Sequence, residues 1–209
     1  MKRFLLLAAS SLLVAAAPAD AKVHGCTLRG AKVVKQSHSS VLFARHGLVY
    51  GCLRSKGSIY RLSHVQEPRV VTKVFSTRLR GRYVAYGELY YGPAGGDDIV
   101  LIRVRDLVTG RVIHSAQNGL SSQAQQIGSM VLKTSGSVAW TTRDYVNWYP
   151  PRPEELQVLA LDGRLTDKLV RPRPLDRGAA IELRSLRGGS GRTVHWRNAG
   201  AARSAELRR

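Results

Sequence analysis

A short phrase that ends in an aromatic residue occurs four times along the chain. Each copy has a glycine turn, then an apolar residue, then an aromatic residue two positions later: RHGLVY (45–50), LRGRYVAY (79–86), SGSVAW (135–140) and GSGRTVHW (189–196). A spacing of two places both side chains on one face of a β-strand. The four pairs are Leu48 and Tyr50, Val84 and Tyr86, Val138 and Trp140, and Val194 and Trp196. The repeat therefore predicts an all-β chain built from one recurring unit.

The sequence around each phrase extends the unit to several strands. A short apolar run precedes every phrase, so the unit begins as a strand, a tight turn and a second strand. The second and third units continue with the alternating runs IVLIRVRD and ELQVLALDG, which end in turns at 106–110 and 162–163. Four strands per unit, repeated four times, predict a small β-propeller-like array of about four antiparallel sheets. An open partial propeller and a β-sandwich are the alternatives.

The last unit lacks material for its final strand. We expect the segment GCTLRGAKVVKQS (25–37) to supply it by pairing with the last unit, which would close the array into a ring.

The turn motifs also carry a resemblance. RVRDLVTGRVI resembles the outer hairpin of quinoprotein-like and WD-repeat-like propeller blades. The succession GRYVAY, DLVTGR, GSVAW, LDGR and VHW is similar to uncharacterised secreted β-propeller-like proteins of high-GC bacteria. The resemblance covers most of the chain after residue 21. It implies a fold and a compartment, and it carries over no site residues.

The N-terminus has the pattern of a secretory signal peptide. Lys2 and Arg3 precede the apolar run FLLLAASSLLVAAA, and Ala19-Asp20-Ala21 offers small residues for cleavage. We therefore predict a signal peptide at 1–21 and a single domain at 22–209, in a secreted, extracellular or cell-envelope-associated protein; a retained membrane anchor is the alternative. No later stretch is long and apolar enough to cross a bilayer, so no transmembrane segment is expected after cleavage.

The predicted compartment bears on the state of the two cysteines. Cys26 and Cys52 are the only cysteines of the chain, and an oxidising environment favours one disulfide between them. The alternative is that VHGC is a lipoprotein processing site, with Cys26 as a lipid anchor.

The formal net charge is +19. Such a charge draws a protein towards anionic surfaces. We expect an anionic cell-wall polymer or another exported protein as partner, and no specific nucleic-acid binding, because no recognition helix or ordered stacking motif accompanies the charge. A solvated basic surface without a dedicated site is the alternative.

Two long insertions supply the candidate binding residues. ELYYGPAGGDD (88–98) and TTRDYVNWYPPRPEE (141–155) join the second and third strands of their units, so they should lie side by side on one face of a propeller-like array. Aromatic rings flanked by arginine suit a sugar, a peptide or a stacked base, although the rings can also simply pack the loops. The predicted ligand-binding residues are Tyr90, Tyr91, Arg143, Tyr145, Trp148, Tyr149 and Arg152.

Catalytic chemistry has no comparable signal. The histidines are scattered, no nucleophile elbow is present, and no spacing typical of a metal or cofactor site occurs, so no catalytic residue, metal or cofactor is predicted. The sequence favours a secreted, non-catalytic binding module; the alternative is an extracellular hydrolase or lyase that acts on acidic polysaccharide. Ring closure and oligomeric state stay open at this point.

Overall fold

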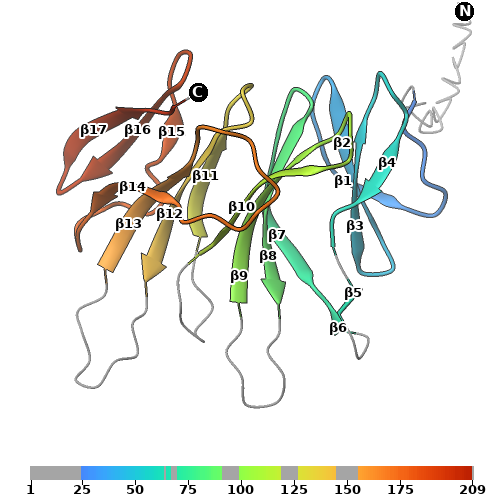
Figure 1. The fold of residues 1–209 in the computed structure, drawn as a ribbon, viewed down its shortest axis with the longest axis horizontal. Coiled ribbons are helices and arrows are strands. Elements are labelled where there is room, and N and C mark those ends of the chain that lie inside the picture. Colours follow the sequence, from blue (N-terminus) through green and yellow to red (C-terminus); the bar gives the residue numbers. More distant parts are fainter. Residues whose placement is uncertain are drawn as a thin grey trace, which may run out of the picture.

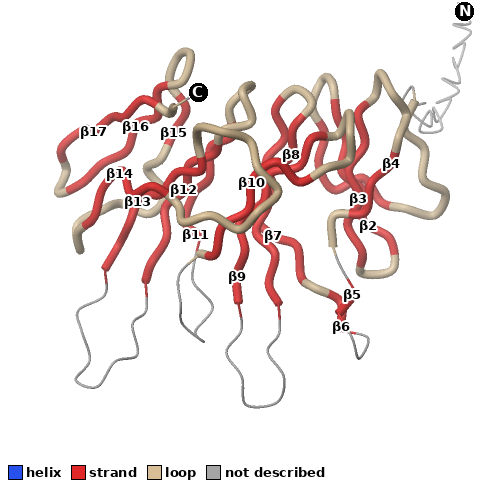
Figure 2. The backbone as a smooth tube through the Cα atoms, in the orientation of Figure 1, coloured by secondary structure: helices blue, strands red, loops and turns tan. Residues whose placement is uncertain are grey.

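The chain folds into antiparallel β-sheets. The structure, a computed structural model, describes residues 25–63, 65–66, 70–90, 99–118, 127–144 and 155–208, and the side chains of 65, 66, 70, 71 and 144 are not described. The predicted signal peptide lies outside these residues. All regular elements in the described ranges are strands, joined by turns and loops (Figure 2). The prediction of an all-β chain is confirmed.

Four sheets of three or four strands make up most of the molecule. Sheet 1 contains, in order, β1 (Lys32–Gln36), β2 (Ser40–Arg45), β3 (Leu48–Leu53) and β4 (Ile59–Arg61). Sheet 2 contains β7 (Lys73–Arg80), β8 (Tyr83–Tyr90), β9 (Ile99–Asp106) and β10 (Val112–Gln117). Sheet 3 contains β11 (Ile127–Leu132), β12 (Val138–Asp144), β13 (Glu155–Leu161) and β14 (Arg173–Arg177). Sheet 4 contains β15 (Arg187–Gly188), β16 (Thr193–Asn198) and β17 (Ala201–Glu206), and a small hairpin joins β5 (Val65–Gln66) to β6 (Val70–Val71).

The sheets stand in a row that follows the chain. Sheet 1 lies at one end, sheet 4 at the other, and sheets 2 and 3 lie between them (Figure 1). The segment expected to close a ring does not pair with sheet 4, because β1 pairs with β2 at the edge of sheet 1. The prediction that residues 25–37 complete the last unit is therefore wrong. In the described residues the four sheets stand in a row, and none of them closes on itself.

Successive sheets pack face to face through valine–aromatic pairs. Val84 and Tyr86 pack against sheet 1, Val138 and Trp140 against sheet 2, and Val194 and Trp196 against sheet 3. All six side chains are at most 4 % exposed. Each buried side chain of this size contributes about 1.5–3 kcal/mol to stability, so these pairs form the repeated core of the array.

In the first unit, the buried pair of the repeat lies one strand earlier than the sequence predicts. Leu48 and Tyr50 lie on the third strand of sheet 1 and are only half-buried. The matching second strand is β2, where Val41 and Phe43 are 0 % and 4 % exposed. The turn before β2 uses serine instead of glycine: the Ser37 hydroxyl accepts a hydrogen bond from the Ser40 amide at 3.1 Å. The recurring pair is thus a valine and an aromatic residue in all four units.

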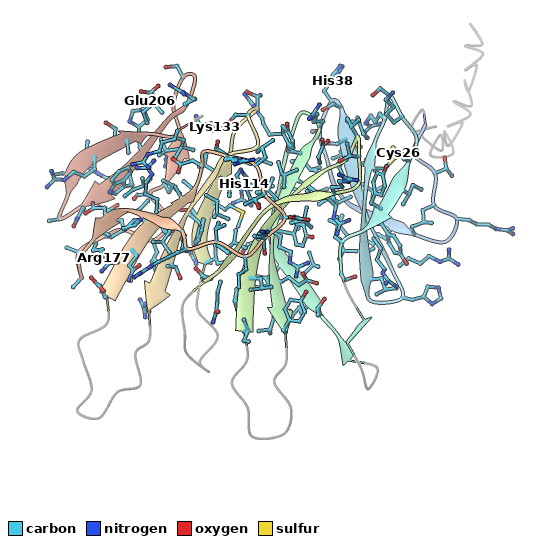
Figure 3. All side chains as sticks on the ribbon, viewed as in Figure 1. Cys26, His38, His114, Lys133, Arg177 and Glu206 are labelled. Atoms are coloured by element: carbon cyan, nitrogen blue, oxygen red, sulfur yellow. A yellow bond between two sulfur atoms is a disulfide. The ribbon has the colours of Figure 1, made fainter. Side chains whose placement is uncertain are left out.

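Among the described residues no sheet precedes Val41 and Phe43, and the segment from Cys26 to Ala31 covers them instead. Cys26, Leu28 and Ala31 pack in one cluster with these two side chains. The disulfide between Cys26 and Cys52 ties the segment to β3, and Cys26 lies at the sheet 1 end of the array (Figure 3). The predicted disulfide is confirmed, and it holds a cover over the first sheet.

The opposite end of the array is polar. The face of sheet 4 that points away from sheet 3 carries Arg187, Thr193, His195, Arg197, Ser204 and Glu206, and we call these six residues the terminal face. His195 stands between Val194 and Trp196 on the strand and points to the other side, as its position predicts. Its counterparts Leu42, Ala85 and Ala139 are buried against the next sheet, whereas His195 is exposed.

Side chains also bond neighbouring sheets to one another. Lys35 Nζ donates to the Thr77 carbonyl at 2.8 Å, and Arg78 Nε donates to the Met130 carbonyl at 2.9 Å. A register irregularity occurs next to these contacts in each of the three first strands, β1, β7 and β11. Bulges free backbone groups from the ladder, and here the first strands of adjacent sheets use them for contacts between sheets.

One crossing segment joins sheets 2 and 3 along their outer edge. The connection from β13 to β14 runs back over β10, where the Thr166 amide donates to the Ile113 carbonyl at 2.7 Å and the Val170 amide donates to the Ser115 carbonyl at 2.9 Å (Figure 1). This pairing covers a strand edge that would otherwise be open. No helix that could span a bilayer is found in the described residues.

Candidate functional site

The candidate site lies where the second strands of sheets 2 and 3 end. β8 ends at Tyr90, β12 ends at Asp144, and both ends lie along one edge of the array, which we call the loop edge (Figure 1). Of the seven predicted ligand-binding residues, Tyr90 and Arg143 are described. The other five lie outside the described residues: Tyr91, Tyr145, Trp148, Tyr149 and Arg152.

Tyr90 belongs to a polar network that sequence reasoning missed. Its hydroxyl donates to Glu88 Oε2 at 3.1 Å and accepts a hydrogen bond from Arg103 Nη2 at 2.7 Å. Arg103 Nε lies 3.2 Å from the same carboxylate oxygen of Glu88. Thr72 Oγ1 donates to the other oxygen, Glu88 Oε1, at 2.5 Å. A tyrosine, an arginine and a threonine thus converge on one buried carboxylate.

Strand geometry explains this convergence. Glu88 and Tyr90 are two residues apart on β8, so they share a face, and Arg103 lies directly opposite Tyr86 of that face on β9. Thr72 immediately precedes β7, the other neighbour of β8. The Glu88 side chain is fully buried and the Arg103 side chain is 17 % exposed. The guanidinium of Arg103 also lies over the Tyr90 ring, with 5.5 Å between its carbon and the ring centroid.

The environment keeps the nearby phenols neutral. Burial, and then the Glu88 carboxylate, raise the pKa of Tyr90 well above its ordinary value, although Arg103 opposes the shift. Burial raises the pKa of Tyr86 as well, against the opposing charge of Arg105. A hydroxyl that holds its proton donates a hydrogen bond and does not act as a nucleophile. The network therefore fixes the base of the loop at 91–98 and does not create a reactive phenolate.

Arg143 lies near the same end of the equivalent strand in sheet 3, but on the opposite strand face from the one that Tyr90 occupies in sheet 2. It lies on β12 opposite Leu156 of β13 and is half-buried. It is two residues before the loop at 145–154, as Tyr90 immediately precedes the loop at 91–98. The structure therefore places both described members of the predicted site at the loop edge, one in each sheet.

A second buried network of hydrogen bonds links sheets 2 and 3. Trp140 Nε1 donates to Asn118 Oδ1 at 2.6 Å, and Asn118 Nδ2 donates to Thr142 Oγ1 at 3.1 Å. Asn118 is 1 % exposed. These bonds satisfy the indole of the repeated tryptophan, so this group serves the packing of sheets 2 and 3.

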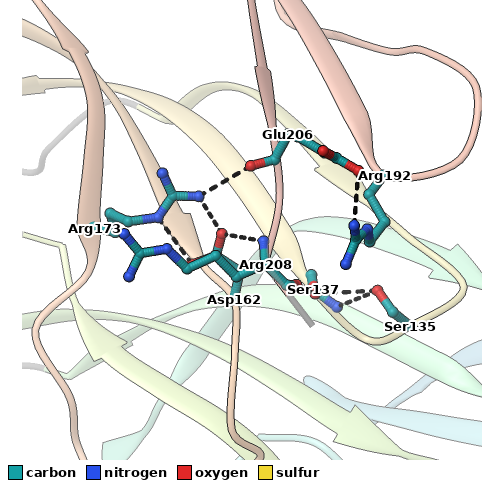
Figure 4. A network of polar contacts seen from close by, with 7 residues as sticks. All are labelled: Ser135, Ser137, Asp162, Arg173, Arg192, Glu206 and Arg208. Atoms are coloured by element: carbon teal, nitrogen blue, oxygen red, sulfur yellow. Dashed lines mark hydrogen bonds and ion pairs between the residues drawn. The ribbon is translucent and has the colours of Figure 1, made fainter.

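Two further described carboxylates, Asp162 and Asp176, are also engaged within the protein. Asp162 pairs with the Arg173 guanidinium and accepts a hydrogen bond from the Arg208 amide at 2.8 Å (Figure 4). Burial alone would raise the pKa of Asp162, but these hydrogen bonds outweigh it and lower the pKa. Asp176 Oδ2 accepts hydrogen bonds from Trp196 Nε1 at 2.7 Å and Asn198 Nδ2 at 3.0 Å. Both residues link strands at the sheet 4 end.

The described residues hold no group of three or more histidine, cysteine, aspartate or glutamate side chains that could bind a metal. His114 is 1 % exposed on β10, and burial lowers its pKa against the opposing charge of Asp162. A buried neutral imidazole of this kind cannot reach a substrate in solvent. Many of the accessible described side chains are arginine or lysine. Comparison with protein-family models, with curated proteins and with solved structures gives no match to this chain.

Proposed function

We propose that the protein is a secreted, non-catalytic binding module of the cell envelope or extracellular space, and that its ligand is an anionic polymer. The aromatic loops at the loop edge supply close contacts and the basic surface supplies attraction. Another exported protein with an acidic surface would satisfy the same charge requirement. The proposed binding residues are those predicted from the sequence, with Tyr90 and Arg143 as the described members.

One observation carries the proposal. Among the described side chains that are exposed, eighteen are arginine or lysine and three are aspartate or glutamate. Two of these three acids, Glu182 and Glu206, already pair with Arg197 and Arg192. Glu88, Asp106 and Asp162 are likewise paired with arginine. Exposed cations therefore far outnumber exposed carboxylates over the described surface, which favours a positive field there.

The disulfide supports the proposed secreted or cell-envelope location. Disulfides persist in oxidising environments and are rare in reducing ones, and the Cys26–Cys52 bond holds the cover of sheet 1 in place. A protein that needs this bond for its end cover is suited to export.

Binding of the purified protein to immobilised polymers tests the proposal. We expect retention on a linear polyuronate and on polyphosphate at low salt, progressive loss with rising salt, and no retention on a neutral dextran. Equal retention on dextran, or no retention on either polyanion, would show that the proposal is wrong.

The catalytic alternative is tested with the same polymers. A non-catalytic module leaves the chain length of the polyuronate unchanged after long incubation, and no new reducing ends or unsaturated ends form. Formation of either product in proportion to protein concentration would instead establish a hydrolase or a lyase.

A further inference from the structure

We infer that the terminal face is an auxiliary surface on which an acidic polysaccharide binds, in addition to the residues at the loop edge. The inference rests on the proposed function and names the part of the molecule and the class of polymer. The terminal face is the outer side of sheet 4, at the end of the array farthest from the disulfide (Figure 3).

The register of sheet 4 brings two arginines and a histidine together. Arg187 of β15 lies directly opposite His195 of β16, and Arg197 follows two positions later on the same side. Residues directly opposite each other in an antiparallel pair have Cβ atoms about 4.5–5.5 Å apart, and residues two apart along a strand are separated by about 6.6 Å. All three side chains are exposed. The three side chains thus form a compact group and not a scattered charge.

The face also carries small residues and groups that form hydrogen bonds. Ser204 lies opposite His195, and Ala202 lies opposite Arg197. Gly189 lies next to His195, where a side chain at this position would clash with the imidazole. The Ser204 and Thr193 hydroxyls add donors and acceptors that match sugar hydroxyls.

Comparison within the array shows that this face differs from its equivalents. In sheets 1 to 3 the same face is apolar and is covered by the next sheet. In sheet 4 the residues at these positions are polar and exposed. A polar end prevents further stacking of sheets, as in the terminal units of repeat proteins, but that requirement does not demand a basic surface.

The charge identifies the ligand. Guanidinium groups pair with carboxylates in a two-point geometry. The nearest acids do not fill this role: Glu182 lies 4.0 Å from Arg197 with both side chains largely exposed, and Glu206 pairs with Arg192. Exposed ion pairs of this kind contribute little, so a polymer carboxylate can replace Glu182.

Two other occupants fit less well. A second copy of the chain would bring a positive surface against a positive surface, since the protein carries +19. A single-stranded nucleic acid needs aromatic side chains on which bases stack. The face offers none, because Trp196 points into the core and its Nε1 donates to Asp176.

A pair of double variants tests the assignment. Arg187→Ser with Arg197→Ser removes two cations from the terminal face, and Arg45→Ser with Arg61→Ser removes two exposed cations from sheet 1 as a matched control. Affinity for a linear polyuronate is measured over a range of salt concentrations, with the melting temperature of each variant as a check on folding. We expect the terminal-face variant to bind roughly tenfold more weakly at moderate salt and the control to change affinity less than threefold.

The outcomes separate the two proposals. If the unmodified protein binds no polyanion, the proposed function fails. If it binds and both double variants weaken binding equally, or neither does, the function stands and the terminal face is not the site. If the terminal-face variant loses affinity for poly(dT) more than for the polyuronate, the polysaccharide is the wrong class of ligand.

Discussion

Arg103 contacts Tyr90 in two ways at once: its guanidinium lies over the ring, and its Nη2 donates to the ring hydroxyl at 2.7 Å. The same guanidinium pairs with the buried carboxylate of Glu88. One side chain therefore neutralises an interior charge and positions the residue from which the loop at 91–98 departs.

Loss of this arginine should strongly destabilise the fold. Arg103→Met removes the guanidinium that pairs with the buried Glu88 carboxylate and binds the Tyr90 hydroxyl, and we expect the free energy of unfolding to fall by about 3 kcal/mol. Urea denaturation followed by fluorescence measures the change. Arg111→Met, at an exposed turn next to β10, is the control and should change stability by less than about 0.5 kcal/mol. Equal effects of the two substitutions would contradict the role given to Arg103.

His114 should make the protein sensitive to mild acid. Because burial holds its pKa below the ordinary value of 6.5, the folded state resists protonation, while the unfolded state takes up a proton below about pH 6.5. The stability that the neutral imidazole provides is complete above that pH and decreases as the pH falls towards the lowered pKa. His114→Leu should remove this part of the decrease, as measured by melting temperatures between pH 7 and pH 5. Parallel pH profiles for both proteins would show that His114 is not the responsible group.

Removal of the disulfide should expose the core of the first sheet. Cys26→Ser with Cys52→Ser frees the segment that covers Val41 and Phe43, and the loss of a cross-link over 26 residues should cost about 3 kcal/mol. Chemical denaturation with and without a reducing agent measures the cost. The reducing agent should lower the stability of the unmodified protein to that of the variant and leave the variant unchanged. A dye that binds exposed apolar surface should bind the variant more strongly, and unchanged dye binding would show that the cover stays in place without the bond.

The aromatic loops should contribute to binding independently of net charge. Trp148→Ala is expected to leave folding intact and to abolish binding to isolated cell-wall polymer, because a stacking contact is removed while every cation remains. Sedimentation with the polymer measures binding. Leu169→Ala, at a side chain 58 % exposed on the crossing segment, is the control and should bind like the unmodified protein. Unchanged binding by Trp148→Ala would remove the loops from the proposed site.

The sequence predicted the sheets well, and it failed in the first unit for an identifiable reason. Alternation of apolar and polar residues reports strand faces directly, so Val84, Val138 and Val194 were placed correctly with their aromatic partners. The glycine pattern assigns the turn of the first unit to Gly47. In the structure, the turn that matches those of the other units precedes β2, and the Ser37 hydroxyl closes it. Hydrogen bonds from side chains can replace glycine in a turn, and a search based on glycine misses them.

In the candidate site, too, the sequence reveals local clusters of residues and does not reveal contacts between residues that are far apart in the chain. Tyr90 and Arg143 were selected because aromatic and basic residues gather in two long loops, which is a local property. Glu88 was not selected, because its partners Thr72 and Arg103 come from different strands and meet it only after folding. The terminal face was missed for a related reason: alternation shows that His195 opposes Trp196, but it does not show whether another sheet packs against that face.

The covered face of sheet 1 and the polar face of sheet 4 free this array from a constraint that applies to any closed ring of sheets. A closed ring fixes the number of blades, since the last must meet the first at a set angle. Here each interior sheet needs only a valine and an aromatic residue on one side and small or apolar residues such as Ala85 or Ala139 on the other. Duplication or deletion of one interior unit should therefore lengthen or shorten the molecule and leave both ends intact.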